Sequence, residues 1–595
     1  MTQMYHKLED GHFRLLSFNN LAGTDCQLNS YEINRAPRYI ALSYVWGDAT
    51  SQETCRISVN GEQIQVRQNL YDALRHLAIP ILRRRCLLWV DAVCINQTDV
   101  EERNAQVRKM KAIFEKAKHI YAWLGLPRDG DETRLAIQLM WELDLYYRDA
   151  RAKHDDDMAA IAANIRTKLV FWPGPGSGDI ETRKAWQGIS NIFSRPYWKR
   201  TWIYQEVTTP TDIQFWCGRY NFNHWCFTAA VRFTFAFLEI PGFNNRSMRV
   251  TGAIHANQAH AARLSRCANT TRRLIDLLFE IRPTLCTDPR DKVYALLGHA
   301  ADVAPDQLSI DYDKSPVDVY VDVVKLYVFH KENPTLDFLG HTFVPPDDMA
   351  QQGWSDPSVP SWVPDWRPPT KIPPIYKGPS RDGVASYPFD PCPGTTIEAY
   401  IRNAMLELRG VVMDNLRIEI LTDMWSADLD YTDLSTPRRW YDDFIGNGDV
   451  TWDEPIRRAL VGSRTEFLDD QNVGHVEVSQ MVDWDLVDME EAQLDRLEYG
   501  TKRSAMIRDI NRICRCRRMA MLSDGSIAIV PGGSRSGDRI TLFHGGKALY
   551  VLRPIPERRN TFRFIGECYV DGLMDGALME LNARRGRTAS LVRMV

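Results

Sequence analysis

Polar side chains stand at the ends of two apolar runs of this sequence, where a protein core would not select them. The runs are YIALSYVWGD (39–48) and LLWVDAVCINQTD (87–99). Their polar and aromatic residues are Ser43, Tyr44, Trp46, Gly47, Asp48, Asp91, Asn96 and Gln97. Carboxylate, hydroxyl and amide groups beside an indole ring suit a small polar ligand, because Asp91 could accept ribose hydroxyls and Trp46 could stack on a base.

A third stretch, RPYWKRTWIYQEV (195–207), mixes aromatic and charged residues. Its guanidinium at Arg200 could hold a diphosphate, and the ring of Trp202 could stack on an aromatic ligand. Its carboxylate, Glu206, lies four residues after Trp202, and an apolar wall strengthens the field of a carboxylate. The pattern is typical of a binding site for a nucleotide or another small molecule.

Each of these residues also has a purely structural interpretation. Gly47 and Asp48 could form a turn, Asp91 could cap a backbone turn, and Asn96 and Gln97 could bond within their loop. Both tryptophans could be core residues. Glu206 could be half of a buried ion pair, and the candidate partners are Arg195 and Arg200.

The elements around these residues indicate an α/β sheet. Residues 38–125 alternate apolar runs with helical patterns, including a helix over 99–120 capped by Thr98 or Asp99, and a hairpin that turns at Asn60 and Gly61. Nearly continuous apolar runs are typical of parallel strands, whose two faces are both covered. Sites in such sheets gather at the carboxyl ends of the strands, so the polar residues should meet there.

The rest of the chain predicts three further segments. Residues 1–215 form the α/β domain, 216–344 a helical region, and 345–395 a connector rich in Pro and Trp. Residues 396–595 carry period-two segments separated by Gly turns, which predict an antiparallel β module. An acidic insert, helical or mobile, interrupts this module near 425–500.

Charge, apolar runs and missing motifs argue against several classes of function. The net charge of −4 gives no electrostatic reason to expect nucleic acid or a membrane surface as a partner. No apolar run is long enough for a membrane span, and the scattered cysteines predict reduced thiols in a cytoplasmic protein. We find no GxGxxG, P-loop, HExxH or GxSxG motif, and Cys514 and Cys516 lack a second pair at zinc spacing. We therefore expect no metal and no bound cofactor.

The three stretches, in this order, resemble the three blocks of the fungal heterokaryon-incompatibility (HET) domain. Two later stretches, DPRDKVYALLG (288–298) and the C-terminal GDRITLFHGGKALYVLRPI (537–555), resemble regions that follow this domain in stand-alone members. The family is known for programmed cell death after the fusion of incompatible cells. The resemblance thus implies an incompatibility or cell-death protein of fungal origin.

HET domains are in turn distantly similar to TIR domains, which use a parallel α/β sheet and in many members cleave NAD. That likeness implies a TIR-like sheet, a possible homo-oligomer, and Glu206 in the place of the catalytic glutamate. NAD(P) would then be the substrate, cleaved at the bond between nicotinamide and ribose. A positively charged nicotinamide leaves without a general acid, so one buried carboxylate suffices chemically.

Two other functions stay open at this level. The α/β domain could be a signalling adaptor that only associates with copies of itself. Alternatively, the scaffold could have been recruited for another reaction, such as tailoring a natural product, because the connector could frame an apolar pocket.

Overall fold

The computed structural model describes most of the 595 residues. The described ranges are 4–46, 54–128, 131–153, 179–209, 211–238, 272–304, 306–346, 356–369, 372–375, 389–402, 404–425, 434–445, 453–463, 465–468, 476–479, 481–482, 506–507 and 509–595. They divide into two compact units. Unit 1 comprises 1–274 and 284–314, and unit 2 comprises 275–283 and 315–595, so the predicted helical region contributes to both.

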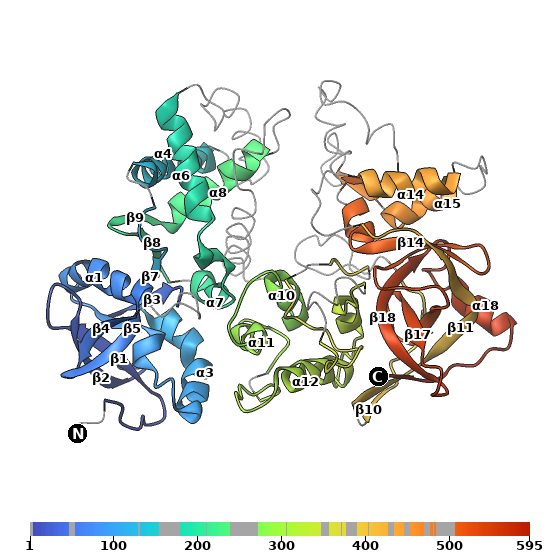
Figure 1. Ribbon diagram of the computed structural model, residues 1–595, viewed down its shortest axis with the longest axis horizontal. Helices are drawn as coiled ribbons and strands as arrows, with labels where there is room; N and C mark the ends of the chain where they lie inside the picture. Colours follow the sequence, from blue (N-terminus) through green and yellow to red (C-terminus); the bar gives the residue numbers. More distant parts are fainter. Residues whose placement is uncertain are drawn as a thin grey trace. The chain divides into compact units, whose positions relative to one another are not determined.

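Unit 1 is built on a nine-stranded mixed sheet (Figure 1). The spatial order is β5-β4-β2-β1-β6-β3-β7-β8-β9. The strands are β1 (His12–Phe18), β2 (Asp25–Glu32), β3 (Tyr39–Tyr44), β4 (Thr54–Val59), β5 (Glu62–Arg67), β6 (Leu87–Trp89), β7 (His119–Trp123), β8 (Ile213–Cys217) and β9 (Tyr220–Asn223). The predicted parallel sheet is correct for its centre, since β6, β3, β7 and β8 run parallel.

The rest of this sheet adds antiparallel pairs to the parallel centre. Three hairpins add antiparallel pairs: β1 with β2, β4 with β5, and β8 with β9. Short connections explain these pairs, because a tight turn can join only antiparallel neighbours. The turn between β4 and β5 was predicted, and it places Asn60 at φ 52° and Gly61 at φ 82°.

Helices cover both faces of the parallel centre. The crossovers β3→β6 and β6→β7 run in opposite directions along the sheet, so right-handed connections place α1 (Gln68–Arg83) and α3 (Val100–Lys116) on opposite faces (Figure 1). The start of α3 confirms the predicted cap, because the Asp99 side chain accepts a hydrogen bond from the backbone N–H of Glu102. The apolar run 87–99 forms only a short strand: after Trp89 the chain turns into α2 (Asp91–Cys94).

The remaining helices of unit 1 come from its second half. They are α4 (Glu132–Lys153), α6 (Ile180–Phe193), the 3₁₀ helix η1 (Pro196–Lys199), α7 (Ile203–Thr208), α8 (His224–Leu238) and α11 (Asp291–Leu297). An isolated β-bridge matters for the site, because Arg200 pairs with Leu285 in parallel just before α7. Segments about 85 residues apart in sequence thus meet beside the sheet.

Unit 2 contains a closed antiparallel barrel, which bears out the predicted β module. Pairing runs β11-β14-β15-β18-β17-β16, and β16 pairs back to β11. The strands are β10 (Ala399–Arg402), β11 (Met405–Leu421), β14 (Arg517–Leu522), β15 (Ile527–Pro531), β16 (Arg539–Phe543), β17 (Leu549–Pro554), β18 (Thr561–Val570) and β19 (Ser590–Met594). Closure leaves the barrel strands without free edges.

Helices and a small sheet accompany the barrel in unit 2. They are α10 (Leu274–Ile281), α12 (Pro316–Val328), the 3₁₀ helix η3 (Asp337–His341), α14 (Ser435–Ile445), α15 (Asp453–Val461), α18 (Ala577–Arg584), and the pair β12 (Thr465–Leu468) with β13 (Val476–Ser479). The helices α14 and α15 and the small pair fall in the predicted acidic insert. A core cluster that includes Trp425, Trp440, Ile510 and Ile513 joins this region to the barrel strands.

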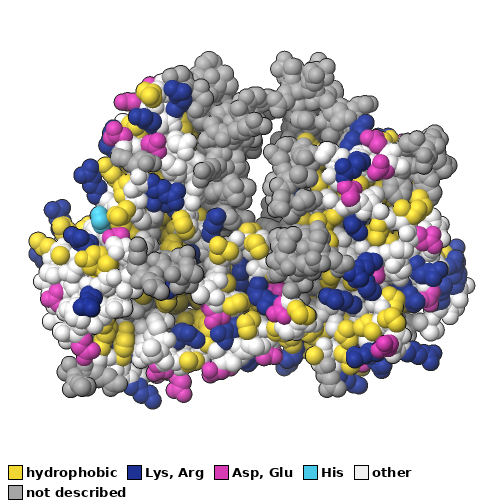
Figure 2. Space-filling model, viewed as in Figure 1, with side chains coloured by type: hydrophobic (Ala, Val, Ile, Leu, Met, Phe, Trp, Pro, Cys, Tyr) yellow, Lys and Arg dark blue, Asp and Glu magenta, His cyan; other side chains and the backbone are white. Residues whose placement is uncertain are grey.

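The surface agrees with the balanced composition. Figure 2 shows basic and acidic side chains interspersed with apolar ones on the face in view. Every helix among the described residues is too short or too polar to cross a lipid bilayer.

Candidate functional site

The carboxyl ends of two central strands meet in unit 1, as the sequence predicts. Ser43 is the second-last residue of β3, and Asp91 follows β6 as the first residue of α2. Because β3 pairs in parallel with β6, these two ends open toward the same edge of the sheet. Ser43 and Tyr44 are buried, while Trp46 is 37% exposed and lies at the rim.

Glu206 on α7 joins this edge. Its carboxylate is 3% exposed and accepts a hydrogen bond at Oε2 from the hydroxyl of Ser43. The Ser43 Oγ also lies 2.7 Å from the hydroxyl oxygen of Tyr197. Since the only hydroxyl proton of Ser43 points to Glu206, Tyr197 must be the donor of this second bond. A buried chain of hydroxyls therefore ends on the carboxylate.

Arg200 is the counter-charge of this carboxylate. Its Nη1 lies 3.5 Å from Glu206 Oε2, so the ion pair predicted as the structural alternative is present. The other candidate, Arg195, donates to the carbonyl of Leu126 at 2.8 Å. The Arg200 pair is loose, because charge-assisted N–H···O bonds measure about 2.7–2.9 Å. Nη1 is buried and makes no hydrogen bond to the residues that the structure describes.

The pKa of Glu206 reflects opposing effects. Burial raises the pKa above its ordinary value, while Arg200 and the Ser43 hydrogen bond lower it and the nearby Asp91 raises it further. Asp91 behaves alike: burial raises its pKa, and Arg200 together with hydrogen bonds from Trp46 and the Ala92 backbone lower it. Two carboxylates therefore share the field of one guanidinium, and the cluster disfavours carrying both negative charges.

Trp46 and Tyr44 line the same region. The indole Nε1 of Trp46 donates to Asp91 Oδ2 at 2.8 Å, which fixes the carboxylate and the ring together. Burial raises the pKa of Tyr44 well above its ordinary value, and the charges of Asp91, Arg200 and Glu206 all act on this phenol. The structure thus brings together six of the eleven predicted site residues: Ser43, Tyr44, Trp46, Asp91, Arg200 and Glu206.

Two predicted residues have local partners. The Oδ1 atom of Asn96 accepts bonds from the backbone N–H and the hydroxyl of Thr98, and Gln97 Nε2 donates to the carbonyl of Asp91 at 2.9 Å. Both contacts shape the loop that follows α2. Gly47 and Asp48, which the sequence also assigns to the site, lie outside the described residues.

Trp202 is held by a residue from a later part of the chain. Its indole N–H donates to Asp291 Oδ2 at 2.9 Å, and the hydroxyl of Tyr312 donates to Asp291 Oδ1 at 2.6 Å. Burial raises the pKa of Asp291 to about 6, opposed by these two hydrogen bonds. Asp291 therefore anchors the start of α7. The segment DPRD (288–291) thus contacts the third of the three blocks.

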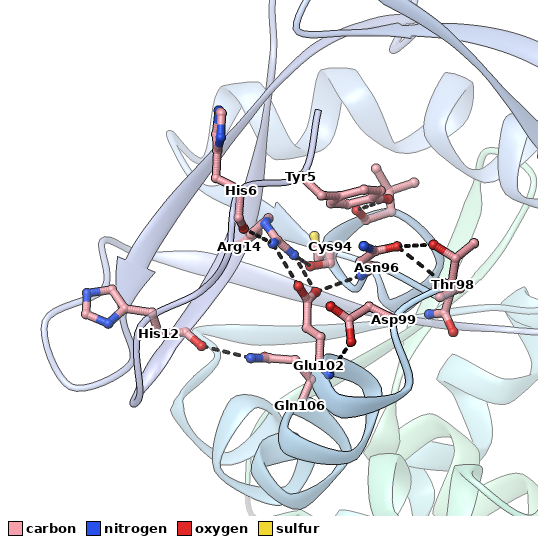
Figure 3. A network of polar contacts seen from close by, with 12 residues as sticks. Tyr5, His6, His12, Arg14, Cys94, Asn96, Thr98, Asp99, Glu102 and Gln106 are labelled. Carbon is pink, nitrogen blue, oxygen red and sulfur yellow. Dashed lines mark hydrogen bonds and ion pairs between the residues drawn. The ribbon is translucent and has the colours of Figure 1, made fainter. Parts of the chain in front are cut away.

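A second anchor holds the loop after β6 (Figure 3). The guanidinium of Arg14 on β1 binds both carboxylate oxygens of Glu102 at 2.6 and 3.0 Å, and it also donates to the backbone carbonyls of His6 and Cys94. Glu102 accepts in addition from the backbone N–H of Asn96 at 2.8 Å. Both charged side chains are at least nine-tenths buried, so this ion pair fixes the loop between Asp91 and α3.

Sequence reasoning missed the residues that position the site. Tyr197, Arg14, Glu102 and Asp291 all act across long stretches of chain, and their contacts have no local pattern. Tyr197 and Asp291 each lie inside a stretch that carries the family resemblance, 195–207 and 288–298, and that resemblance is the signal that could have found them. Within the described ranges, no three or more His, Cys, Asp and Glu side chains form a group that could hold a metal ion.

Comparison with known proteins agrees with this geometry. Residues 39–206 match the family described as Heterokaryon incompatibility protein (HET), and residues 488–587 match the Het-6 beta-barrel domain. The first match begins at β3 and ends at Glu206, so it spans the whole strand-end cluster. The second falls on the barrel of unit 2. Residues 39–206 are therefore similar to the HET family, as the three blocks predicted.

One relative aligns with nearly the whole chain. The chain is 26% identical over 663 aligned residues to "Heterokaryon incompatibility protein 6, OR allele" of Neurospora crassa, which covers 96% of this chain and 95% of the relative. No solved structure matches the chain. The likeness to TIR domains therefore stays a prediction.

Proposed function

We propose that this protein acts in fungal incompatibility and cell death, and that its HET domain cleaves the nicotinamide–ribose bond of NAD(P). The relative named for heterokaryon incompatibility supports the cellular role. The observation that carries the chemical role is the pair of carboxylates, Asp91 and Glu206, that share Arg200 at the carboxyl ends of the strands.

This cluster suits a transition state with positive charge on the sugar. Cleavage of an N-glycosidic bond passes through an oxocarbenium-like state. Burial raises the pKa of both carboxylates, and the charge of Asp91 raises the pKa of Glu206 further. A positive charge that develops beside them would therefore stabilise their ionised forms. Glu206 would face the sugar carbon, and Asp91 would accept ribose hydroxyls.

Other groups of the cluster would hold the remainder of the substrate. The Nη1 of Arg200 has no protein hydrogen bond and would bind the diphosphate. The exposed ring of Trp46 would stack on the nicotinamide or adenine ring. The hydroxyl chain from Tyr197 through Ser43 would orient the Glu206 carboxylate toward the sugar.

The test is nicotinamide release by the purified protein, alone and clustered on a support. We expect Glu206→Gln to reduce release by about 100-fold or more, because it removes the charge that stabilises the transition state. Asp144→Asn is the matched control, since Asp144 is equally buried and paired with Arg148 on α4. Equal activity of wild type and Glu206→Gln would remove Glu206 from the mechanism.

One observation favours a second function, that of a signalling adaptor without catalysis. The Glu206 carboxylate already has two partners, Ser43 and Arg200, and such a carboxylate also serves as a structural ion pair. In that case clustered wild-type protein releases no nicotinamide, and Glu206→Gln lowers the unfolding midpoint. Expression in a fungal host then separates the two functions, because cell death would persist without NAD loss.

A further inference from the structure

A second polar site lies at the opposite end of the parallel strands of unit 1. A surface hollow of about 490 Å³ is lined by residues before β3, at the end of α3, and before β8. They are Ala36, Pro37, Arg38, Glu115, Lys116, Ala117, Lys118, Thr211 and Asp212. These residues lie at the amino ends of the strands, whereas Ser43 lies at the carboxyl end of β3. The hollow is therefore separate from the strand-end cluster of Ser43, Asp91, Arg200 and Glu206.

Cations from three elements converge on this edge. Arg38 stands before β3, Lys118 before β7, and Arg84 directly after α1. Burial raises the pKa of the Cys86 thiol, and the charges of Arg84, Arg38 and Lys118 each lower it, which places all three around one sulfur atom. Clustering three cations costs energy through mutual repulsion, in a chain whose net charge is −4. Such a cluster is typical of an anion site.

The backbone holds these side chains at fixed positions. The carbonyl of Arg38 accepts from the N–H of Leu87, and the N–H of Lys118 donates to the carbonyl of Tyr39 at 2.8 Å. Both residues therefore belong to the ends of the central ladder rather than to a free loop. Their side chains are exposed, so a ligand can reach them.

The carboxylate of Asp212 in the hollow has its own partners. Its Oδ2 lies 3.1 Å from His119 Nδ1, and its Oδ1 lies 3.7 Å from His224 Nδ1. Arg84 Nη1 lies 3.1 Å from the other nitrogen of His119 and connects this group to the cation cluster. Asp212 nevertheless lines the hollow together with Glu115, so the three cations Arg38, Lys116 and Lys118 face two carboxylates there and outnumber them by one.

We propose that this hollow binds a soluble ligand that carries two or more phosphate groups. Its volume falls within the range of about 300–1,000 Å³ that small-ligand sites occupy. Guanidinium groups grip phosphate oxygens in pairs, and lysine ammonium groups add charge from any direction. The site is independent of NAD cleavage, since it shares no residue with the strand-end cluster.

The experiment is calorimetric titration of the full chain with inorganic triphosphate and with ATP. We expect binding that weakens as salt is added, because the contacts are exposed charges. The double variant Arg38→Gln/Lys118→Gln should weaken binding by about tenfold or more through loss of two charge-assisted contacts. Both side chains are exposed, so this variant should unfold at the wild-type temperature.

The control removes the same charge elsewhere in unit 1. Arg75→Gln/Lys153→Gln changes two exposed cations on α1 and α4, and it should bind within twofold of wild type. Vesicles of phosphatidylcholine with and without a phosphoinositide form the second arm. Absence of binding to either phosphate probe, an equal loss in the control variant, or binding to phosphoinositide vesicles alone would each overturn the proposal.

Discussion

Two arginines, the buried Arg517 of unit 2 and the partly buried Arg200 of unit 1, differ in how completely their hydrogen bonds are satisfied. In unit 2, Arg517 at the start of β14 donates to the carbonyls of Arg512, Ile513 and Pro373 at 2.7–2.9 Å. In unit 1, Arg200 has a loose ion pair to Glu206 and a buried Nη1 without a hydrogen bond. A guanidinium whose N–H groups all have protein acceptors holds the backbone in place. A guanidinium with an unbonded N–H group can donate a hydrogen bond to a ligand.

The largest expected effect tests the structural half of this comparison. Arg517→Met leaves three carbonyls without their donor, and unsatisfied buried groups cost about 1–3 kcal/mol each. We expect the free energy of unfolding of unit 2 to fall by about 3 kcal/mol or more, measured by urea denaturation. Arg409→Gln is the control, because its pair with Glu398 is well exposed and is worth below about 1 kcal/mol. Equal effects of the two variants would contradict the distinction.

A pH series tests the anchor beneath α7. The pKa of Asp291 is raised to about 6 in the folded chain, against 3.8 when exposed. The folded state thus binds this proton more tightly, so its contribution to stability is full below pH 4 and is lost as the pH rises through about 6. The change is about 3 kcal/mol.

Asp291→Asn removes this titration. The difference in unfolding free energy between wild type and variant should therefore change between pH 4 and 7, in favour of the wild type at low pH. A difference that stays constant across this range would show that Asp291 does not titrate in the folded chain.

The smallest effect concerns the hydroxyl chain. Tyr197→Phe keeps the ring against Trp198 and removes one hydrogen bond to Ser43, at a cost of about 1 kcal/mol. We expect the pH profile of nicotinamide release to move, because Ser43 then orients Glu206 less firmly. Tyr39→Phe is matched, since it removes one buried hydroxyl bond, to Ile113, far from Glu206. A shift that is the same in both variants would indicate general destabilisation.

The local elements were predictable because their signals are local. The Asn60–Gly61 turn, the cap at Asp99 and the apolar stripe of α3 each depend on a few neighbouring residues. The mixed sheet was not predictable, because β1 and β2 precede the first recognised strand and pair through contacts that no periodicity encodes. The strand-end rule located Ser43 and Asp91, whereas Glu206 came from a family resemblance.

The positioning residues show the same limit. Arg14 and Glu102 are 88 positions apart and look like ordinary surface charges in the sequence. Only the fold buries them against one another. Asparagine is common in loops, so the residue type alone suggested that Asn96 bonds within its loop. Its hydrogen bond from the Thr98 hydroxyl fits that interpretation.

The ion pair in Figure 3 has a consequence for how this domain is cut out of the chain. The family match begins at residue 39, yet Arg14 lies on β1, which is a strand of the same sheet. A fragment of residues 39–206 would keep Glu102 and discard its counter-charge, together with strands on both sides of the parallel centre. The smallest piece that can fold autonomously must therefore extend beyond the conserved-domain boundaries at both ends.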